Sequence, residues 1–393
     1  MPLQSAFTLN SNEIFGSIAN MIISQEVFAD NLGKHQSLVD QARVDGSLYG
    51  DKKLYYATDV LKSVAWGNDA EAANLLALDR PSDPKVQDIT LDVFRQIRLT
   101  VDNYLSKRAW STEGAFSSFN SVMLGWMRET KRVYVGTLYN VHIGTTESSI
   151  GSQEQQVDVT TAIASASTQE EANRLEAVAI AQALANLMVE MGDYSREFND
   201  YGFLRSYGEE EIKVIWNAQY LNKILKIDLP TIFHKEGLLS KMEEKLPARY
   251  FGVVITAANV ASYSDATPAA GKPIDSDDSS YVPGSNHANG CIRSMVEKDV
   301  TVSAVAYHVF PGDEIPAGAT IKAGGTFELG EVYIEDASII CKVLVKLSPF
   351  MSSFEVGTSF FNPRSLTENH YLTFGHNTLE KLDNYPFITV RAA

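Results

Sequence analysis

The feature that most constrains this chain is a run of strict alternation between Ile89 and Leu105. Apolar side chains fill most odd positions of the run, and polar side chains fill most even positions. An alternation of period two predicts a β-strand with one covered face. At about 3.3 Å per residue this strand would reach roughly 50 Å, whereas strands in globular domains usually stop by about ten residues. We therefore expect the covered face to lie on something outside the strand's own domain.

The period changes after the basic stretch Ser106-Lys107-Arg108. Large apolar side chains then recur at helical spacing from Phe116 to Val141, and Ser111 or Thr112 is available as the N-cap. About thirty residues at about 1.5 Å each predict a rod of roughly 45 Å. A long strand joined to a long rod is a scaffold for contacts with neighbouring molecules rather than the plan of an enclosed pocket.

Length and composition exclude several classes of protein. The 393 residues suffice for two or three domains, and 45% hydrophobic and 21% charged residues are typical of a folded, soluble chain. The net charge of −16 argues against a nucleic-acid clamp, which needs a basic face to displace counterions. Cys291 and Cys341 are too few for a disulfide framework and favour a reducing compartment. With no signal peptide and no run of eighteen apolar residues, we expect no membrane contact.

The rest of the chain predicts an α+β protein whose strands come from distant parts of the sequence. Thr168 and Glu171 form a capping box that opens a helix ending near Gly192. Further helices are expected within residues 10–45, 218–225 and 236–245. Strands are expected at residues 52–58, 157–160, 212–216, 251–255, 300–309, 331–347, 371–374 and 387–390, a turn at the prolines of 80–84, and an exposed loop at 261–290.

Catalytic and metal-binding motifs are absent or incomplete, so we expect no enzyme, no metal and no cofactor. The chain has no G-x-S-x-G elbow, no H-E-x-x-H motif and no phosphate-binding P-loop. An EF-hand starting at Asp275 would have Ser280 and Asn286 where glycine and glutamate are needed. His287 and Cys291 lack partners for a tetrahedral zinc site. Paired carboxylates for glycoside hydrolysis could come from the acidic groups at 193, 197, 200 and 209–211, although a solvated acidic face is favoured.

Basic side chains concentrate on the long strand and its surroundings. In so acidic a chain, this concentration suggests docking onto an acidic neighbour, although an ordinary charged edge strand would show the same pattern. The candidate contacts between subunits are Lys52, Lys53, Arg95, Arg98, Lys107, Arg108 and Trp110.

Four stretches resemble the tailed-phage major capsid proteins. Residues 94–134 (FRQIRLTVDNYLSKRAWSTEGAFSSFNSVMLGWMRETKRVY) are similar to that family's join between extended loop and spine helix, and residues 45–63 (DGSLYGDKKLYYATDVLKS) to the start of the loop. Residues 212–225 (IKVIWNAQYLNKIL) resemble a strand–helix piece of the axial domain, and residues 372–390 (LTFGHNTLEKLDNYPFITV) the closing strands. Residues 256–330 match nothing in the family.

The resemblance implies an α+β fold of the Hong Kong 97 type. The implied parts are an N-terminal arm (1–47), an extended loop (48–108), a peripheral domain (109–193 and 331–393, with a spine helix at about 111–145) and an axial domain (194–330, with an exposed insertion at about 256–330). It also implies that copies form the pentamers and hexamers of an icosahedral shell, assembled in the host bacterial cytoplasm with a scaffolding protein and a portal. The shell of the virion would enclose double-stranded DNA without sequence-specific binding.

Two other functions stay open at this point. The first is an encapsulin-like shell of a cellular nanocompartment, which shares the implied fold. The second is an acidic, β-rich carbohydrate-binding protein or hydrolase that uses residues 250–393.

Overall fold

The computed structural model describes residues 37–45, 52–63, 80–102, 113–225, 244–258, 292–316, 319 and 327–393. The chain divides into two compact units, each described here by itself. Unit 1 comprises residues 1–53, 89–139 and 349–379, and unit 2 comprises residues 54–88, 140–348 and 380–393.

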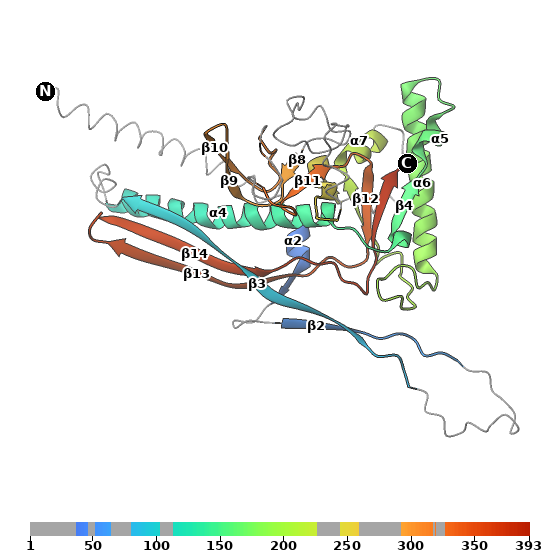
Figure 1. The fold of residues 1–393 in the computed structure, drawn as a ribbon, viewed down its shortest axis with the longest axis horizontal. Helices are drawn as coiled ribbons and strands as arrows, with labels where there is room; N and C mark the ends of the chain where they lie inside the picture. Colours follow the sequence, from blue (N-terminus) through green and yellow to red (C-terminus); the bar gives the residue numbers. More distant parts are fainter. Residues whose placement is uncertain are drawn as a thin grey trace, which may run out of the picture. The chain divides into compact units, whose positions relative to one another are not determined.

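Unit 1 is built on a β-sheet and a long helix (Figure 1). The sheet has the order β1-β13-β14-β3-β2, in which β1 runs parallel to β13 and β13, β14 and β3 are antiparallel. Its strands are β1 (Arg43–Asp45), β13 (Phe350–Asn362), β14 (Thr367–Asn377), β3 (Lys85–Asp102) and β2 (Lys52–Ala57). Residues 54–57 of β2 and 85–88 of β3 are counted with unit 2. The helices are the short α2 (Ser37–Ala42) and α4 (Glu113–Thr145), whose last turn belongs to unit 2.

The strand register decides which side chains of β3 face α4. Arg95 pairs with Phe374, which pairs with Glu355 on β13, so these three side chains lie on one face. On this face the Arg95 guanidinium lies 5.2 Å from the centre of the Tyr134 ring. Nζ of Lys131 lies 2.7 Å from Oε2 of Glu355. The alternation is thus confirmed, but the expectation that the covered face lies outside its own domain is wrong here, because α4 of the same unit lies against it.

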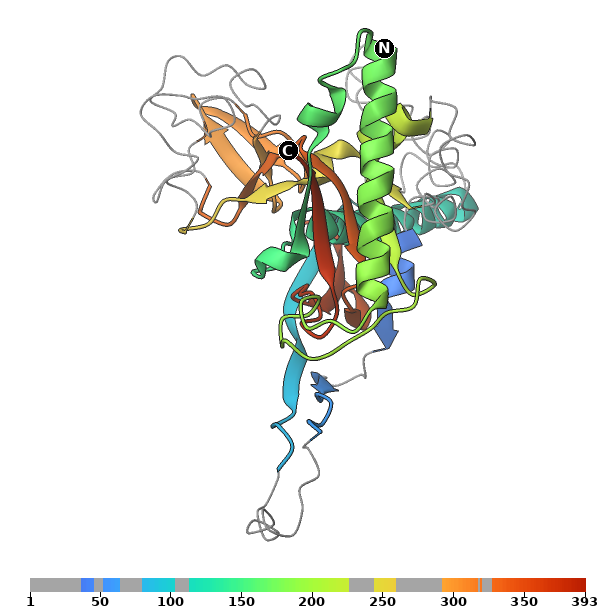
Figure 2. The same ribbon diagram turned by 90° about the vertical axis from the view of Figure 1, so that its right-hand side faces the viewer.

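Unit 2 contains a second five-stranded sheet with the order β4-β15-β12-β5-β6. Helix α6 (Gln169–Gly192) buries Ile180, Leu184 and Met191 against residues of this sheet such as Trp216 and Ile388 (Figure 2). The strands are β4 (Glu154–Val157), β15 (Phe387–Ala392), β12 (Ile339–Leu344), β5 (Lys213–Asn217) and β6 (Lys245–Leu246), and the other helices are η2 (Gly151–Gln153), α5 (Val159–Ile163), α7 (Ala218–Leu225) and η3 (Ala248–Tyr250).

The remainder of the described part of unit 2 consists of a three-stranded sheet and a hairpin. The sheet has the order β7-β11-β8, formed by β7 (Gly252–Val254), β11 (Val332–Glu335) and β8 (Ile292–Ser294). The hairpin pairs β9 (Lys298–Val302) with β10 (Val305–Val309). Buried Ile255, Val300, Phe327 and Ile334 form a separate apolar cluster in this region.

Most of the expected elements are confirmed. Strands β2, β5 and β7 and helices α4, α6 and α7 lie within a few residues of the predicted ranges. Oγ1 of Thr168 accepts a hydrogen bond from the Glu171 N–H (3.2 Å), as the capping box predicts. The Glu171 carboxylate in turn accepts from the N–H of Ser167 (2.9 Å) rather than from that of Thr168.

Several expected elements are corrected. Residues 43–45 and 245 belong to strands rather than helices, and β4 ends at Val157 because Asp158 caps α5. The single strand expected at 300–309 is a hairpin, with Ser303 and Ala304 at positive φ (51° and 65°) in its turn. The strand expected at 331–347 is two strands in different sheets, separated by a turn in which Asp336 accepts from the Ser338 N–H. Strand β13 was not expected. The elements predicted at residues 10–36, 236–243 and 261–290 lie outside the described residues.

Helix α6 lies in unit 2, whereas most of α4 lies in unit 1. By length and composition α6 is the one helix in the described ranges that would suffice to cross a membrane, and 39% of its most apolar window is buried. Its packing on the sheet of unit 2 is that of a core helix.

Candidate interaction surfaces

The face of the unit 1 sheet that points away from α4 carries exposed aromatic side chains. Phe94 on β3 is 58% exposed, Phe360 on β13 is 62% exposed, and Val356 is also exposed. Registers place them on one face, because Thr373 of β14 pairs with both Gln96 and Val356, and Asn369 pairs with both Thr100 and Phe360. We define the outer face of unit 1 by Phe94, Gln96, Arg98, Thr100, Val356 and Phe360. Large exposed apolar side chains gathered on one face mark an interaction surface.

Hydrogen bonds fix the polar part of the outer face. Nε2 of Gln96 donates to Oγ1 of Thr373 (3.1 Å), and Nε of Arg98 donates to Oε1 of Gln96 (3.0 Å). The Phe94 ring lies over Gly375, where an added Cβ would lie 2.9 Å from the ring's Cδ1. Side chains already held in place lose less conformational entropy when a partner docks.

A second surface is the segment of unit 2 that follows β2 and leads into β3. Each end of this segment is held by hydrogen bonds, and we call these two anchored ends the outgoing root and the returning root. At the outgoing root, the Asp59 carboxylate accepts from Nη1 of Arg196 (2.7 Å) and from the N–H of Leu204 (3.0 Å). The hydrogen bonds from Arg196 and then from Leu204 lower the pKa of Asp59 to about 2. Nη2 of Arg205 donates to the carbonyl oxygen of Thr58 (2.8 Å). The root is therefore held by the segment that follows α6.

The returning root is fixed by the side-chain amide of Gln87. Its Nε2 donates to the carbonyl oxygen of Lys381 (2.8 Å), and its Oε1 accepts from the N–H of Asp383 (3.1 Å). We restrict the name extended loop to residues 60–86, between the two roots, which lie within the range 48–108 that the resemblance implies. Its described residues expose Val60, Leu61 and Val86, and Leu61 is 77% exposed. The described ends of this segment thus expose apolar side chains, and both ends are held by hydrogen bonds within unit 2.

The predicted contact residues are only partly brought together. Arg98 lies exposed on the outer face, and Lys52 lies exposed at the start of β2, with Lys53 half-buried beside it. Arg95 contacts Tyr134 of its own unit. Lys107, Arg108 and Trp110 lie outside the described residues. Sequence reasoning missed Phe94 and Phe360. A phenylalanine at position 94, among the polar residues of the alternation, was the available signal.

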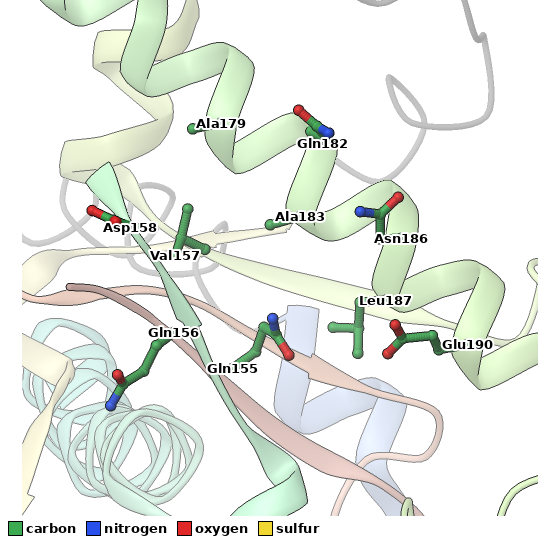
Figure 3. Close-up of a pocket in the computed structure, with 10 residues that line it drawn as sticks. All are labelled: Gln155, Gln156, Val157, Asp158, Ala179, Gln182, Ala183, Asn186, Leu187 and Glu190. Atoms are coloured by element: carbon green, nitrogen blue, oxygen red, sulfur yellow. The ribbon is translucent and has the colours of Figure 1, made fainter. Parts of the chain in front are cut away.

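A groove lies between the edge strand β4 and helix α6 (Figure 3). It has a volume of about 300 Å³, and side-chain amides of Gln155, Gln182 and Asn186 line it together with Ala183 and Glu190. This lining has no nucleophile paired with a base. Among the described residues, no group of three or more His, Cys, Asp or Glu side chains is arranged to hold a metal ion.

The carboxylates considered for hydrolysis have structural partners or face solvent. Asp200 accepts from Nε2 of Gln153 (3.0 Å) and from Oγ of Ser148 (3.1 Å), and it pairs with Lys381. Residues 209–211 are exposed. The calcium and zinc candidates at 275–291 lie outside the part of the chain that the structure describes.

Comparison with known proteins identifies the fold. The sequence matches no protein-family model and no curated protein. The structure is similar to a chain in the capsid of Staphylococcus phage Andhra, with a TM-score of 0.53 and 10% identity over 91% of this chain and 84% of that chain. It is also similar to a chain in the structure of the head fiber and inner core protein gp22 of native bacteriophage P68. That TM-score is 0.54, with 10% identity over 89% of this chain and 83% of the other. The mixed helix and sheet architecture is thus one found in solved phage capsids.

Proposed function

We propose that this chain is the major capsid protein of a tailed phage, with a fold of the Hong Kong 97 type. Copies would form the pentamers and hexamers of an icosahedral shell that encloses double-stranded DNA. The observation that carries this proposal is the fold similarity over 91% of the chain to a chain of a phage capsid. The exposed apolar side chains of the extended loop and of the outer face support it, because both need a partner.

The extended loop of one copy would lie across the outer face of unit 1 of a neighbouring copy. Leu61 and Val86 would then pack near Phe94 and Phe360, and burying one such side chain contributes about 1.5–3 kcal/mol. Arg98, fixed by Gln96, would set the register of the contact rather than its strength. The other candidate contacts between subunits remain Lys52, Lys53, Lys107, Arg108 and Trp110.

The other roles follow from the proposed shell. The chain would be a structural protein without catalytic activity, located in the virion and assembled in the host bacterial cytoplasm with a scaffolding protein and a portal. A net charge of −16 suits a container for DNA, since a lining that bound phosphate tightly would hinder packing and release. The arm (1–47), loop (48–108), peripheral and axial divisions are part of this proposal.

The test replaces the extended loop while leaving both roots intact. A larger deletion, of residues 52–105, would also remove the part of β3 that pairs with β14 from Leu91 to Asp102. Exchanging residues 60–84 for a short Gly/Ser linker, together with Val86→Ser, removes both Leu61 and Val86 and keeps Asp59, Gln87 and the backbone of β3. We expect the variant to stay folded and soluble but to form no shells, tubes or capsomer rings by electron microscopy and sizing chromatography. Normal shells from this variant would contradict the proposal.

A further inference from the structure

The groove between β4 and α6 combines amides, small apolar side chains and carboxylates. Its amide residues are Gln155, Gln156, Gln182 and Asn186, its apolar residues are Val157, Ala179, Ala183 and Leu187, and its carboxylates are Asp158 and Glu190. Among these ten described residues there is no Lys, Arg or His. In the described ranges, none of the four side-chain amides has a hydrogen-bond partner within the protein. The groove therefore offers free hydrogen-bonding groups and negative charge along an apolar surface.

The shape of the groove favours a long, thin ligand. Asp158, which follows β4, and Glu190, near the end of α6, lie at opposite ends of the groove (Figure 3). From Ala179 to Glu190 the lining follows α6 for roughly 16 Å, at about 1.5 Å per residue. The volume of about 300 Å³ is at the lower end of the range for ligand pockets. A ligand that contacts both carboxylates must therefore be narrow and extended.

Both carboxylates are available to a ligand with positive charge. Hydrogen bonds from the side chain and the backbone of Thr161 lower the pKa of Asp158, so its carboxylate is ionised at neutral pH. Within the part of the chain that the structure describes, neither Asp158 nor Glu190 forms an ion pair. Arg391, on the adjacent strand β15, is already paired with three other carboxylates.

The end of α6 adds to the negative potential of the groove. The C-terminal end of a helix carries partial negative charge, which a basic side chain in the last turn often compensates. The last turn of α6 has no basic residue, and Glu190 lies there instead. The net charge of −16 acts in the same direction. This end of the groove therefore attracts a cation from outside the chain.

The lining decides which class of ligand matches it. It has no basic residue to hold an anion and no aromatic ring on which a sugar could stack. A linear polyamine matches each part of the lining. Its terminal ammonium groups suit the two carboxylates, its methylene groups suit the apolar side chains, and its N–H groups can donate to amide oxygens.

We propose that the groove between β4 and α6 binds a linear polyamine of the spermidine type, with one terminal ammonium group at Asp158 and the other at Glu190. The methylene groups lie along Ala179 and Ala183, and the amide oxygens of Gln182 and Asn186 accept hydrogen bonds from the amine. The site belongs to the single chain and does not rest on the proposed shell function. Bound polyamine offsets part of the net charge of −16.

Isothermal titration calorimetry of the unassembled full-length protein with spermidine tests the site. We expect one spermidine per chain, with weaker binding of 1,4-diaminobutane and the weakest binding of butylamine, which has a single ammonium group. Asp158→Asn and Glu190→Gln should each weaken spermidine binding about threefold to fivefold, and the double variant about tenfold or more. Asparagine caps a helix as well as aspartate does, so Asp158→Asn leaves the start of α5 capped.

The matched control is Glu210→Gln, which removes the same charge from an exposed residue outside the groove. This variant should bind spermidine as tightly as the wild type. Equal weakening by Glu210→Gln, or butylamine or Mg²⁺ binding as tightly as spermidine, would indicate general attraction to an acidic surface and would overturn the proposal. A tetralysine peptide that binds at least about tenfold more tightly than spermidine would assign the groove to a basic peptide and would also overturn it.

Discussion

At the scale of single residues, Lys342 on β12 is a buried charged side chain of unit 2. It is fully buried, and its Nζ donates to the carbonyl oxygen of Thr146 (2.9 Å) and to Oγ1 of Thr389 (2.8 Å). Removal from water disfavours the charged ammonium and lowers its pKa to about 8. The folded state therefore releases this proton at lower pH than the unfolded chain.

The lowered pKa predicts a measurable dependence of stability on pH. Below about pH 8, Lys342 is protonated in both the folded and the unfolded chain, so the cost of burying its charge lowers the stability in full. This cost disappears as the pH rises towards 10.5, the pKa of lysine in the unfolded chain. Relative to a Lys342→Met variant, the wild type should gain about 2 kcal/mol of unfolding free energy between pH 7.5 and 9.5. Urea titrations of unassembled protein at both pH values check this. Parallel pH profiles for the two proteins would contradict it.

At the scale of elements, the last turn of α4 depends on a close approach of two backbones. A Cβ at Gly144 would lie 1.8 Å from the carbonyl oxygen of Tyr250, which follows from the packing of this turn on η3. Gly144→Ala must push the helix and η3 apart, and we expect it to cost about 1–3 kcal/mol or more. Gly125→Ala is the matched control, because nothing lies within 4 Å of that position in the same helix. It should stabilise by about 0.5–1 kcal/mol. Thermal unfolding of the two variants should shift in opposite directions.

The same scale shows what the sequence could predict. The alternation of β3 and the helical spacing of α4 identified both elements, because each is long enough for its period to stand out. Strand β13 was missed because the segment Ser352–Phe361 mixes polar residues and phenylalanines on both faces, so no period of two marks a covered side. The break between β11 and β12 depends on Asp336, whose turn contacts and pairing with Arg391 are set by distant strands.

The outer face of unit 1 was predictable only in part, because its composition depends on how distant strands pair. Arg98 was identified from the polar side of the alternation and lies on the outer face. Arg95 interrupts the apolar side of the strand. Sequence alone could not show that its guanidinium packs over the ring of Tyr134 on α4. Phe94 and Phe360 come together only through the register of β14, which no local pattern contains.

At the scale of the whole molecule, the outer face of unit 1 should decide whether copies assemble. Phe360→Asp puts a charge on that face, and Ser359→Asp puts the same charge on the adjacent, exposed residue that points to the other face of the sheet. We expect Phe360→Asp to abolish shells, because burying an unpaired carboxylate is costly, while thermal stability stays within about 0.5 kcal/mol. Ser359→Asp should assemble. Shells of normal size from Phe360→Asp would show that the outer face is not an interface.

The two roots of the extended loop differ in chemistry, and ionic strength acts on only one of them. The outgoing root includes the ion pair of Asp59 with Arg196, whose side chain is 46% exposed, besides hydrogen bonds from Leu204 and Arg205, and salt weakens exposed ion pairs. The returning root depends on neutral amide bonds from Gln87 to the backbone, which salt does not screen. Hydrogen exchange in high salt should therefore rise near residues 58–59 and stay unchanged near residue 87. The outgoing root would then loosen while the returning root keeps its hydrogen bonds, so high salt would free the loop from one end first.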